Sequence, residues 1–285
     1  MIRAMMCAPA AAQVVAALLL SAGLVSLPAA AQCSAQSGER TAALVELYTS
    51  EGCDSCPPAD RWLSSLRAQG YTPDKVVPLS LHVDYWDYIG WKDPYAKREF
   101  ATRQRKLADL RRAKIIYTPQ VLLQGQDFRH WSSRGTGAGG SRGTGAGGSR
   151  EFDAAVAKIN AQTPRAKIAL ALGSMGATSV EVTVSAELLD AAEGRQAAVY
   201  LAAYENKLAS QVSAGENRGK TLPHDFVVRE WVGPIEFPAS GRVSDKRTLP
   251  LLPKADPRQS GVAAFVQNRS TLNVLQALML PACTG

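Results

Sequence analysis

The sequence predicts an α/β domain followed by a β-rich, sandwich-like domain in a chain of 285 residues. Two observations lead to this fold class. In the first half, short apolar runs alternate with segments of helical periodicity, which is typical of α/β structure. After residue 167, several short runs with strand periodicity follow one another between turn residues, as in a β-sandwich.

Residues 1–31 have the pattern of a signal peptide. Arg3 gives a weak positive start, Val14–Leu27 is an apolar segment, and Ala29-Ala30-Ala31 is a small-residue cleavage site. The apolar run is short and breaks at Pro28, so it is a poor membrane span. We therefore expect a periplasmic or secreted protein, with no stable membrane insertion after cleavage.

The cysteines indicate disulfides. Removal of the leader takes away Cys7 and leaves Cys33, Cys53, Cys56 and Cys283. An even number of cysteines in an oxidising compartment is typical of a disulfide-bonded protein. Four cysteines allow three pairings. A Cys53–Cys56 bridge leaves Cys33 to pair with Cys283 as a structural disulfide that closes nearly the whole mature chain.

Cys53 and Cys56 lie between a predicted strand, Ala42–Tyr48, and a predicted helix that begins at Pro57-Pro58. A Cys-x-x-Cys turn at a helix N-terminus favours thiolate formation and reversible disulfide chemistry. We expect Cys53, on the open side of the turn, to attack a partner's sulfur. Cys56, covered by the helix, then resolves the mixed disulfide.

Two other interpretations of the cysteine pair exist. A purely structural disulfide fits a secreted protein. A zinc site needs two further ligands, and His82, His130 and His224 are scattered along the chain. We therefore expect neither a metal site nor a cofactor.

The second predicted strand is Lys75–Val83. The segment that follows it is rich in aromatic and acidic residues. In one interpretation, Trp86, Trp91 and the tyrosines form a groove wall beside the cysteines, with Asp84 or Asp87 available for proton transfer. In the other, the segment is a packed aromatic loop whose carboxylates cap turns. Asp93-Pro94 predicts the start of a helix that runs to about Lys114.

The formal charge is +7, and the segment 97–114 carries a large excess of basic residues. This segment is either a solvated helix face or a docking surface for an acidic partner. An exported chain without a recognisable binding module is not expected to bind nucleic acid.

Thr118-Pro119 precedes an apolar strand, Val121–Gln124, that turns back at Gly125-Gln126. A Gly/Ser-rich repeat at 134–149 is an insertion before a closing helix, Glu151–Gln162.

This order of motifs resembles the thioredoxin-fold superfamily. The resemblance implies a thioredoxin-like domain at 40–163, in which Pro119 is a cis-proline that faces the cysteine pair. Thr118, the residue before it, then pairs with the substrate backbone. A β-sandwich-like domain at 164–285 follows.

Four segments resemble the bacterial exported family DUF1223 more narrowly. They surround the cysteines, the aromatic segment and the proline: Glu46–Cys53, Cys56–Asp60, His82–Asp87 and Tyr117–Gln120. The family has a thioredoxin-like domain and no settled activity. Gly52 stands where thioredoxins carry a tryptophan before the first cysteine.

The β-rich half contains a polar loop at Gly215–Asp225. It either connects two strands or rests over the cysteines, with Glu216, Arg218 and His224 facing a ligand. Two adjacent runs, Ala197–Glu205 and Leu208–Ser213, predict a hairpin around Asn206-Lys207.

These observations favour thiol–disulfide exchange through Cys53 and Cys56, with a protein or a small thiol as partner. Thr118, Pro119, Trp86 and Asp84 then form the substrate-binding surface. The alternative is a non-catalytic ligand- or protein-binding protein in which both disulfides are structural.

Overall fold

The structure is a computed structural model. The predicted signal peptide (1–31) and the Gly/Ser-rich repeat (134–149) lie outside the residues that it describes. The described residues are 33–131, 150–176, 178–194, 196–250 and 256–283.

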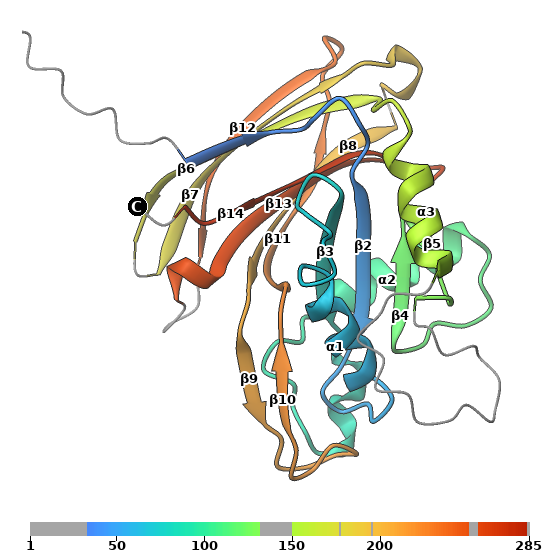
Figure 1. Ribbon diagram of the computed structural model, residues 1–285, viewed down its shortest axis with the longest axis vertical. Coiled ribbons are helices and arrows are strands. Elements are labelled where there is room, and N and C mark those ends of the chain that lie inside the picture. Colours follow the sequence, from blue (N-terminus) through green and yellow to red (C-terminus); the bar gives the residue numbers. More distant parts are fainter. Residues whose placement is uncertain (1–32, 132–149, 177, 195, 251–255, 284–285) are drawn as a thin grey trace, which may run out of the picture. The chain divides into compact units, whose positions relative to one another are not determined.

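An eight-stranded mixed sheet contains strands from both halves of the chain (Figure 1). Its order is β14-β13-β8-β11-β3-β2-β4-β5. β2 and β3 are parallel, and β4 lies antiparallel to β2 on its other edge. Every residue of β2 and β3 is buried, as expected for continuous apolar runs with both faces covered. The strands are β2 (Ala43–Thr49), β3 (Val76–His82), β4 (Gln120–Leu123), β5 (Gln126–Asp127), β8 (Ala197–Glu205), β11 (Val227–Glu236), β13 (Ser260–Asn268) and β14 (Val274–Pro281).

A four-stranded antiparallel sheet packs on one face of the C-terminal strands. Val182 and Val184 of β7 belong to the same apolar cluster as Val199 and Leu201 of β8. β7 alternates buried and half-buried residues, because one of its faces covers this core. The order is β1-β6-β7-β12, with β1 (Cys33–Gln36), β6 (Ala166–Met175), β7 (Ser179–Leu188) and β12 (Arg242–Pro250).

Three α-helices contribute to a second apolar cluster, around β2 and β3. Trp62 of α1 meets Phe152 of α3 edge to face, with ring centroids 5.1 Å apart. Phe100 of α2 is buried in the same cluster. The helices are α1 (Pro57–Ser65), α2 (Arg98–Leu110) and α3 (Arg150–Asn160), and the 3₁₀ helices are η1 (Asp84–Ile89), η2 (Ala191–Glu193) and η3 (Pro257–Gln259).

A separate hairpin is formed by β9 (Leu208–Gln211) and β10 (Thr221–His224). Residues 212–220 connect these two strands and are called the 212–220 loop below. The predicted hairpin between Ala197–Glu205 and Leu208–Ser213 is therefore wrong. Both edges of β8 already pair with β11 and β13, which leaves no edge for β9.

The predicted domain boundary at residue 164 falls within a continuous structure. β11 pairs in parallel with β3 through Val227 and Ser80, and the Ser80 N–H donates to the Phe226 carbonyl at 2.8 Å. Strands from both sides of residue 164 thus share one sheet, and the described residues from Cys33 onward form one compact unit. The chain is β-rich, with mixed and antiparallel sheets.

The helix predicted to begin at Asp93-Pro94 begins at Arg98, with Lys97 as its N-cap. Asp93 is buried, and its carboxylate accepts hydrogen bonds from the N–H groups of Glu51 and Tyr95. These contacts hold Asp93 in a turn ahead of the helix.

Both predicted disulfides are present. Cys33–Cys283 links β1 to the segment after β14, and Cys53–Cys56 closes the Cys-x-x-Cys turn. Disulfides are typical of proteins outside the cytosol. Among the described helices, none has the length and apolar character needed to cross a bilayer.

Candidate functional site

The Cys53–Cys56 disulfide lies between the end of β2 and the start of α1. Its Cα atoms are 5.5 Å apart, and Cys56 is the N-cap residue of α1. The strand–turn–helix arrangement predicted around the cysteines is therefore present.

Both cysteines are buried, with exposed fractions of 1% for Cys53 and 0% for Cys56. The expectation that Cys53 lies on an open side of the turn is wrong, because the 212–220 loop rests on it. The Asn217 amide donates to the carbonyl oxygens of Glu51 and Cys53, both at 2.8 Å. The polar loop therefore fits both alternatives: it connects β9 with β10, and it rests on the cysteine turn.

Glu216 adds a second contact between the 212–220 loop and the turn. Its carboxylate accepts from the Asp54 N–H at 2.9 Å. Arg218 is exposed, whereas His224 is buried at the end of β10. The loop therefore uses Glu216 and Asn217 to fasten itself over the disulfide.

The start of α1 provides the cysteines with fewer free N–H groups than a helix N-terminus usually does. Pro57 and Pro58 carry no N–H, and the N–H groups of Ala59 and Asp60 donate to the Cys56 carbonyl at 2.9 and 3.2 Å. A thiolate here gains from the helix dipole, but these first four residues provide no free amide for it.

Trp86 connects the cysteine turn with the Thr118-Pro119 segment. Its indole N–H donates to the Thr118 hydroxyl at 2.7 Å. A side chain on Gly52 would begin 3.1 Å from the Trp86 Cβ, which places Trp86 against the residue before Cys53. The Thr118–Pro119 peptide bond is cis.

Asp84 is half-buried at the first position of η1. A different carboxylate of the same acidic segment lies deeper. Asp93, which the sequence interpretation used only as a helix cap, accepts from the backbone of Glu51 just before the cysteine turn.

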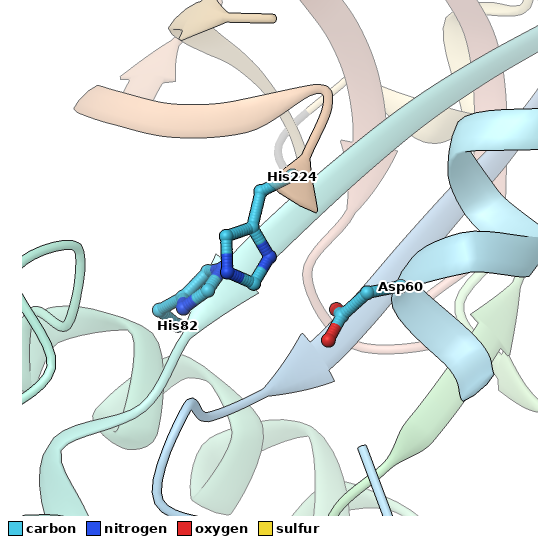
Figure 2. Close-up of side chains that lie close together, drawn as sticks. All are labelled: Asp60, His82 and His224. Carbon is cyan, nitrogen blue, oxygen red and sulfur yellow. The ribbon is translucent and has the colours of Figure 1, made fainter. Parts of the chain in front are cut away.

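Beside the cysteine turn, the structure brings together two histidines that the sequence interpretation left scattered. His82 ends β3, His224 ends β10, and their ring centroids are 4.9 Å apart. Asp60 of α1 completes a buried group of three (Figure 2). The one local signal was the position of His82 at the end of a buried apolar strand. The pairing with His224 depends on long-range packing.

Two further carboxylates fix the histidines. His82 Nδ1 lies 2.7 Å from Asp93 Oδ2, and His224 Nε2 lies 3.0 Å from Glu51 Oε1. All four side chains are buried. Each histidine is therefore oriented through one ring nitrogen.

Burial and charge act in opposite directions on these groups. Burial by itself lowers the pKa of His82, but the charge and hydrogen bond of Asp93 outweigh it and raise that pKa above its usual value. Burial by itself raises the pKa of Asp93, but His82 brings it below the usual value. Burial also raises the pKa of Asp60.

Two solved structures share the fold. Protein AGR_C_4864 from Agrobacterium tumefaciens is 24% identical, with a TM-score of 0.59 over 87% of this chain and 98% of its own. HBP35 of Porphyromonas gingivalis is 14% identical, with a TM-score of 0.61 over 87% of this chain and 79% of its own. At these identities the likeness concerns the fold alone.

No curated protein matches the sequence. The model of a family described as a protein of unknown function, DUF1223, matches residues 44–267. This range includes the Cys-x-x-Cys turn, the aromatic segment, the Thr118-Pro119 segment and the 212–220 loop. The chain belongs to the DUF1223 family.

Proposed function

We propose that this protein is an exported, thioredoxin-like thiol–disulfide exchange protein that reacts through Cys53 and Cys56. The observation that carries the proposal is the disulfide itself: a small ring at the junction of a buried strand and a helix. Such a ring opens and closes with little movement of the backbone. An exported location is supported by the two disulfides and by the leader-like residues 1–31.

The pairing of the first strands supports a thioredoxin-like domain at 40–163. The parallel pair β2 and β3 is joined through α1, and β4 lies antiparallel on the other edge of β2. β5 then pairs with β4, and α3 follows. The cysteines lie after the first of these strands, and Pro119 lies directly before β4.

The structure holds Cys53 and Cys56 as a disulfide, so the exchange is written from that form; attack of a reduced Cys53 on a partner's disulfide, resolved by Cys56, is the same sequence in reverse. In this proposal a thiolate of the partner attacks the Cys53 sulfur and the Cys53–Cys56 bond breaks. Cys56 leaves as a thiolate near the positive end of the α1 dipole. A second thiolate of the partner then attacks the mixed disulfide at its own sulfur. The partner becomes the disulfide, and Cys53 and Cys56 become the dithiol. Trp86, Thr118 and Pro119 hold the partner's chain beside the turn, and Asp84 accepts protons.

Because both sulfurs are buried, exchange requires the 212–220 loop to open. The contacts of Asn217 and Glu216 with the cysteine turn resist this opening. Reactivity is therefore gated by a loop, rather than by permanent exposure of the attacked sulfur.

The burial of both sulfurs also favours a second candidate function. The two cysteines are 0–1% exposed and lie beneath a loop that hydrogen bonds hold in place. Such a disulfide suits a structural role in a non-catalytic binding protein. The two functions differ in redox potential. Equilibration with glutathione buffers is expected to give a Cys53–Cys56 potential above about −300 mV for exchange and below it for a structural bridge.

The gate can be tested with the other disulfide as an internal control. Asn217→Ala removes two hydrogen bonds to the cysteine turn and is expected to speed reduction of Cys53–Cys56 by dithiothreitol about tenfold, the effect of roughly 1.4 kcal/mol. Differential alkylation and mass spectrometry follow each pair separately. Equal acceleration of Cys33–Cys283 would reveal general unfolding and contradict a local gate.

A trapping variant tests the exchange itself. Cys56→Ser leaves Cys53 as a free thiol that attacks a disulfide of glutathione or of a protein from the export compartment, and no Cys56 thiol remains to resolve the product, so the mixed disulfide is expected to accumulate. Cys53→Ser is the matched control and is expected to trap far less. If neither variant forms a mixed disulfide, thiol exchange is ruled out and the structural role remains.

A further inference from the structure

Three buried side chains converge on one point beside the cysteine turn. Asp60 comes from α1, His82 from the end of β3 and His224 from the end of β10, and Figure 2 shows them facing one another. One ligand atom from each lies within 4.8 Å of the other two. Their exposed fractions are 5%, 0% and 2%. Elements far apart in the sequence thus bring three residues of metal-binding types together.

Each of the three residues has one atom with a partner and one without. Asp60 Oδ2 accepts from the Thr49 hydroxyl at 3.2 Å, whereas Asp60 Oδ1 has no protein partner. His82 Nε2 and His224 Nδ1 are likewise buried without a protein partner. A single unpartnered buried polar atom is costly, and three in one place indicate a ligand that satisfies them together.

The partnered ring nitrogens leave the other nitrogens ready to bind an ion. An ionised carboxylate only accepts hydrogen bonds, so His82 Nδ1 donates to Asp93 and His224 Nε2 donates to Glu51. In the neutral tautomers, the lone pairs therefore belong to His82 Nε2 and His224 Nδ1. A carboxylate behind each imidazole is the usual outer contact of a metal-binding histidine.

The buried charges around these three residues also favour a bound cation. Glu51, Asp60 and Asp93 are three buried carboxylates, and the two imidazoles are the basic groups in contact with them. Arg229, a nearby guanidinium, pairs with Glu205 at 3.4 Å. With all three carboxylates ionised and both imidazoles protonated, one negative charge remains in excess. Buried charges are paired or bind metals, and a divalent cation supplies the missing charge.

We propose that Asp60, His82 and His224 bind one divalent transition-metal ion of the zinc class. Two imidazole nitrogens and one carboxylate oxygen form a donor set used for Zn²⁺, with a fourth position left for water or another ligand. The same set also suits Fe²⁺. The harder ions Ca²⁺ and Mg²⁺ prefer sites made of oxygens alone.

The three ligand atoms are close neighbours, and an ion would draw them closer. Zinc–nitrogen and zinc–oxygen bonds are about 2.0–2.2 Å long, so the three atoms must draw closer than the 4.8 Å limit that encloses them. Such an approach requires rotation of the three side chains. The site is separate from the disulfide, so the proposed metal binding does not depend on thiol exchange.

Titration with Zn²⁺ tests the proposal directly. Chelator-treated protein with both disulfides formed is expected to bind one Zn²⁺ per chain and to gain thermal stability with Zn²⁺ concentration. Protein refolded with and without Zn²⁺ serves as a parallel sample, because the site is buried. Co²⁺ is expected to give visible ligand-field absorption without a thiolate charge-transfer band, since the ligands are nitrogen and oxygen.

Matched variants assign the ligands. Asp60→Asn and His224→Gln are expected to abolish stoichiometric binding, and Asp93→Asn, behind His82, is expected to weaken it about 10–100-fold. His130→Gln, at an exposed histidine outside the cluster, is expected to bind as the unaltered chain does. Cooperative thermal unfolding of the disulfide-bonded variants confirms that each variant is folded. Absence of one-to-one binding in the unaltered chain, a buried water alone at the site, or full binding by Asp60→Asn would overturn the proposal.

Discussion

At the scale of single residues, Arg103 is the clearest case of a charge that the fold has enclosed. Its guanidinium makes two hydrogen bonds to the Glu46 carboxylate, at 2.7 and 3.1 Å. It also lies over the rings of Tyr200, Trp231 and Phe265, at 4.8–5.3 Å from their centroids. Burial by itself lowers the pKa of Arg103, but Glu46 outweighs it and raises that pKa. Arg103 thus belongs to the core, although it lies in the basic segment 97–114.

Arg103→Leu is expected to lower the free energy of unfolding by about 3–5 kcal/mol, because it leaves the Glu46 carboxylate buried without its cation. Urea denaturation measures the loss. The double variant Glu46→Leu/Arg103→Leu removes both charges and is expected to be less destabilised than the sum of the single variants. Strict additivity would show that the pair is not coupled.

Packing around Gly52 explains why this chain has no large residue before Cys53. A Cβ there would lie 3.1 Å from the Trp86 Cβ and 3.2 Å from Ile89 Cδ1, both in η1. Gly52→Ala is expected to lower the free energy of unfolding by about 1–3 kcal/mol through overpacking. Gly38→Ala is the matched control, because a Cβ at Gly38 has no neighbour within 4 Å. Equal stabilities of the two variants would contradict this account.

At the scale of elements, the β9–β10 hairpin links the two proposed sites. Its loop covers Cys53 through Asn217, and its last residue, His224, belongs to the proposed metal site. An ion bound to His224 also holds β3 and α1, so it ties the hairpin to the sheet beneath. Metal binding and loop opening are then energetically coupled.

Zinc is therefore expected to slow the reduction of Cys53–Cys56 by a phosphine reductant, and to leave Cys33–Cys283 unaffected. His224→Gln is expected to remove the zinc effect. Alkylation and mass spectrometry measure the two rates. If zinc binds without changing the rate, the end of the hairpin stays in place while the loop opens. The coupling is then absent, but the proposed metal site is still supported.

Local sequence patterns predicted elements better than they predicted partners. The run predicted at Ala197–Glu205 matches β8, because an apolar strand pattern is a local property. The partners of β8 lie on β11 and β13, and no local signal identifies them. The short strand β10 was missed, because Thr221–His224 is polar and contains a proline.

The difference between local patterns and long-range contacts also explains which site could be predicted from the sequence. The cysteine turn is a contiguous motif, so its disulfide and its place before a helix were predictable. The Asp60, His82 and His224 group is assembled by three elements and two sheets, so the histidines looked unrelated. Burial of Cys53 also depends on Asn217, a residue more than 160 positions away in the chain.

At the scale of the whole molecule, the Cys33–Cys283 disulfide joins the two main sheets. β1 is an edge strand of the four-stranded sheet, and Cys283 follows β14, an edge strand of the eight-stranded sheet. The bridge closes a loop with a sequence separation of 250 residues. In the chain-entropy model, such a loop restricts the unfolded chain by roughly 5 kcal/mol.

Replacing both cysteines, Cys33→Ser with Cys283→Ser, is therefore expected to lower the free energy of unfolding by up to roughly 5 kcal/mol, a large part of a typical total. Urea denaturation measures this loss. The reduction rate of Cys53–Cys56 under native conditions is expected to stay unchanged, because the 212–220 loop is held by its own contacts with the cysteine turn. A parallel rise in that rate would mean that the turn opens only with the whole molecule, and would favour a structural role for both bridges.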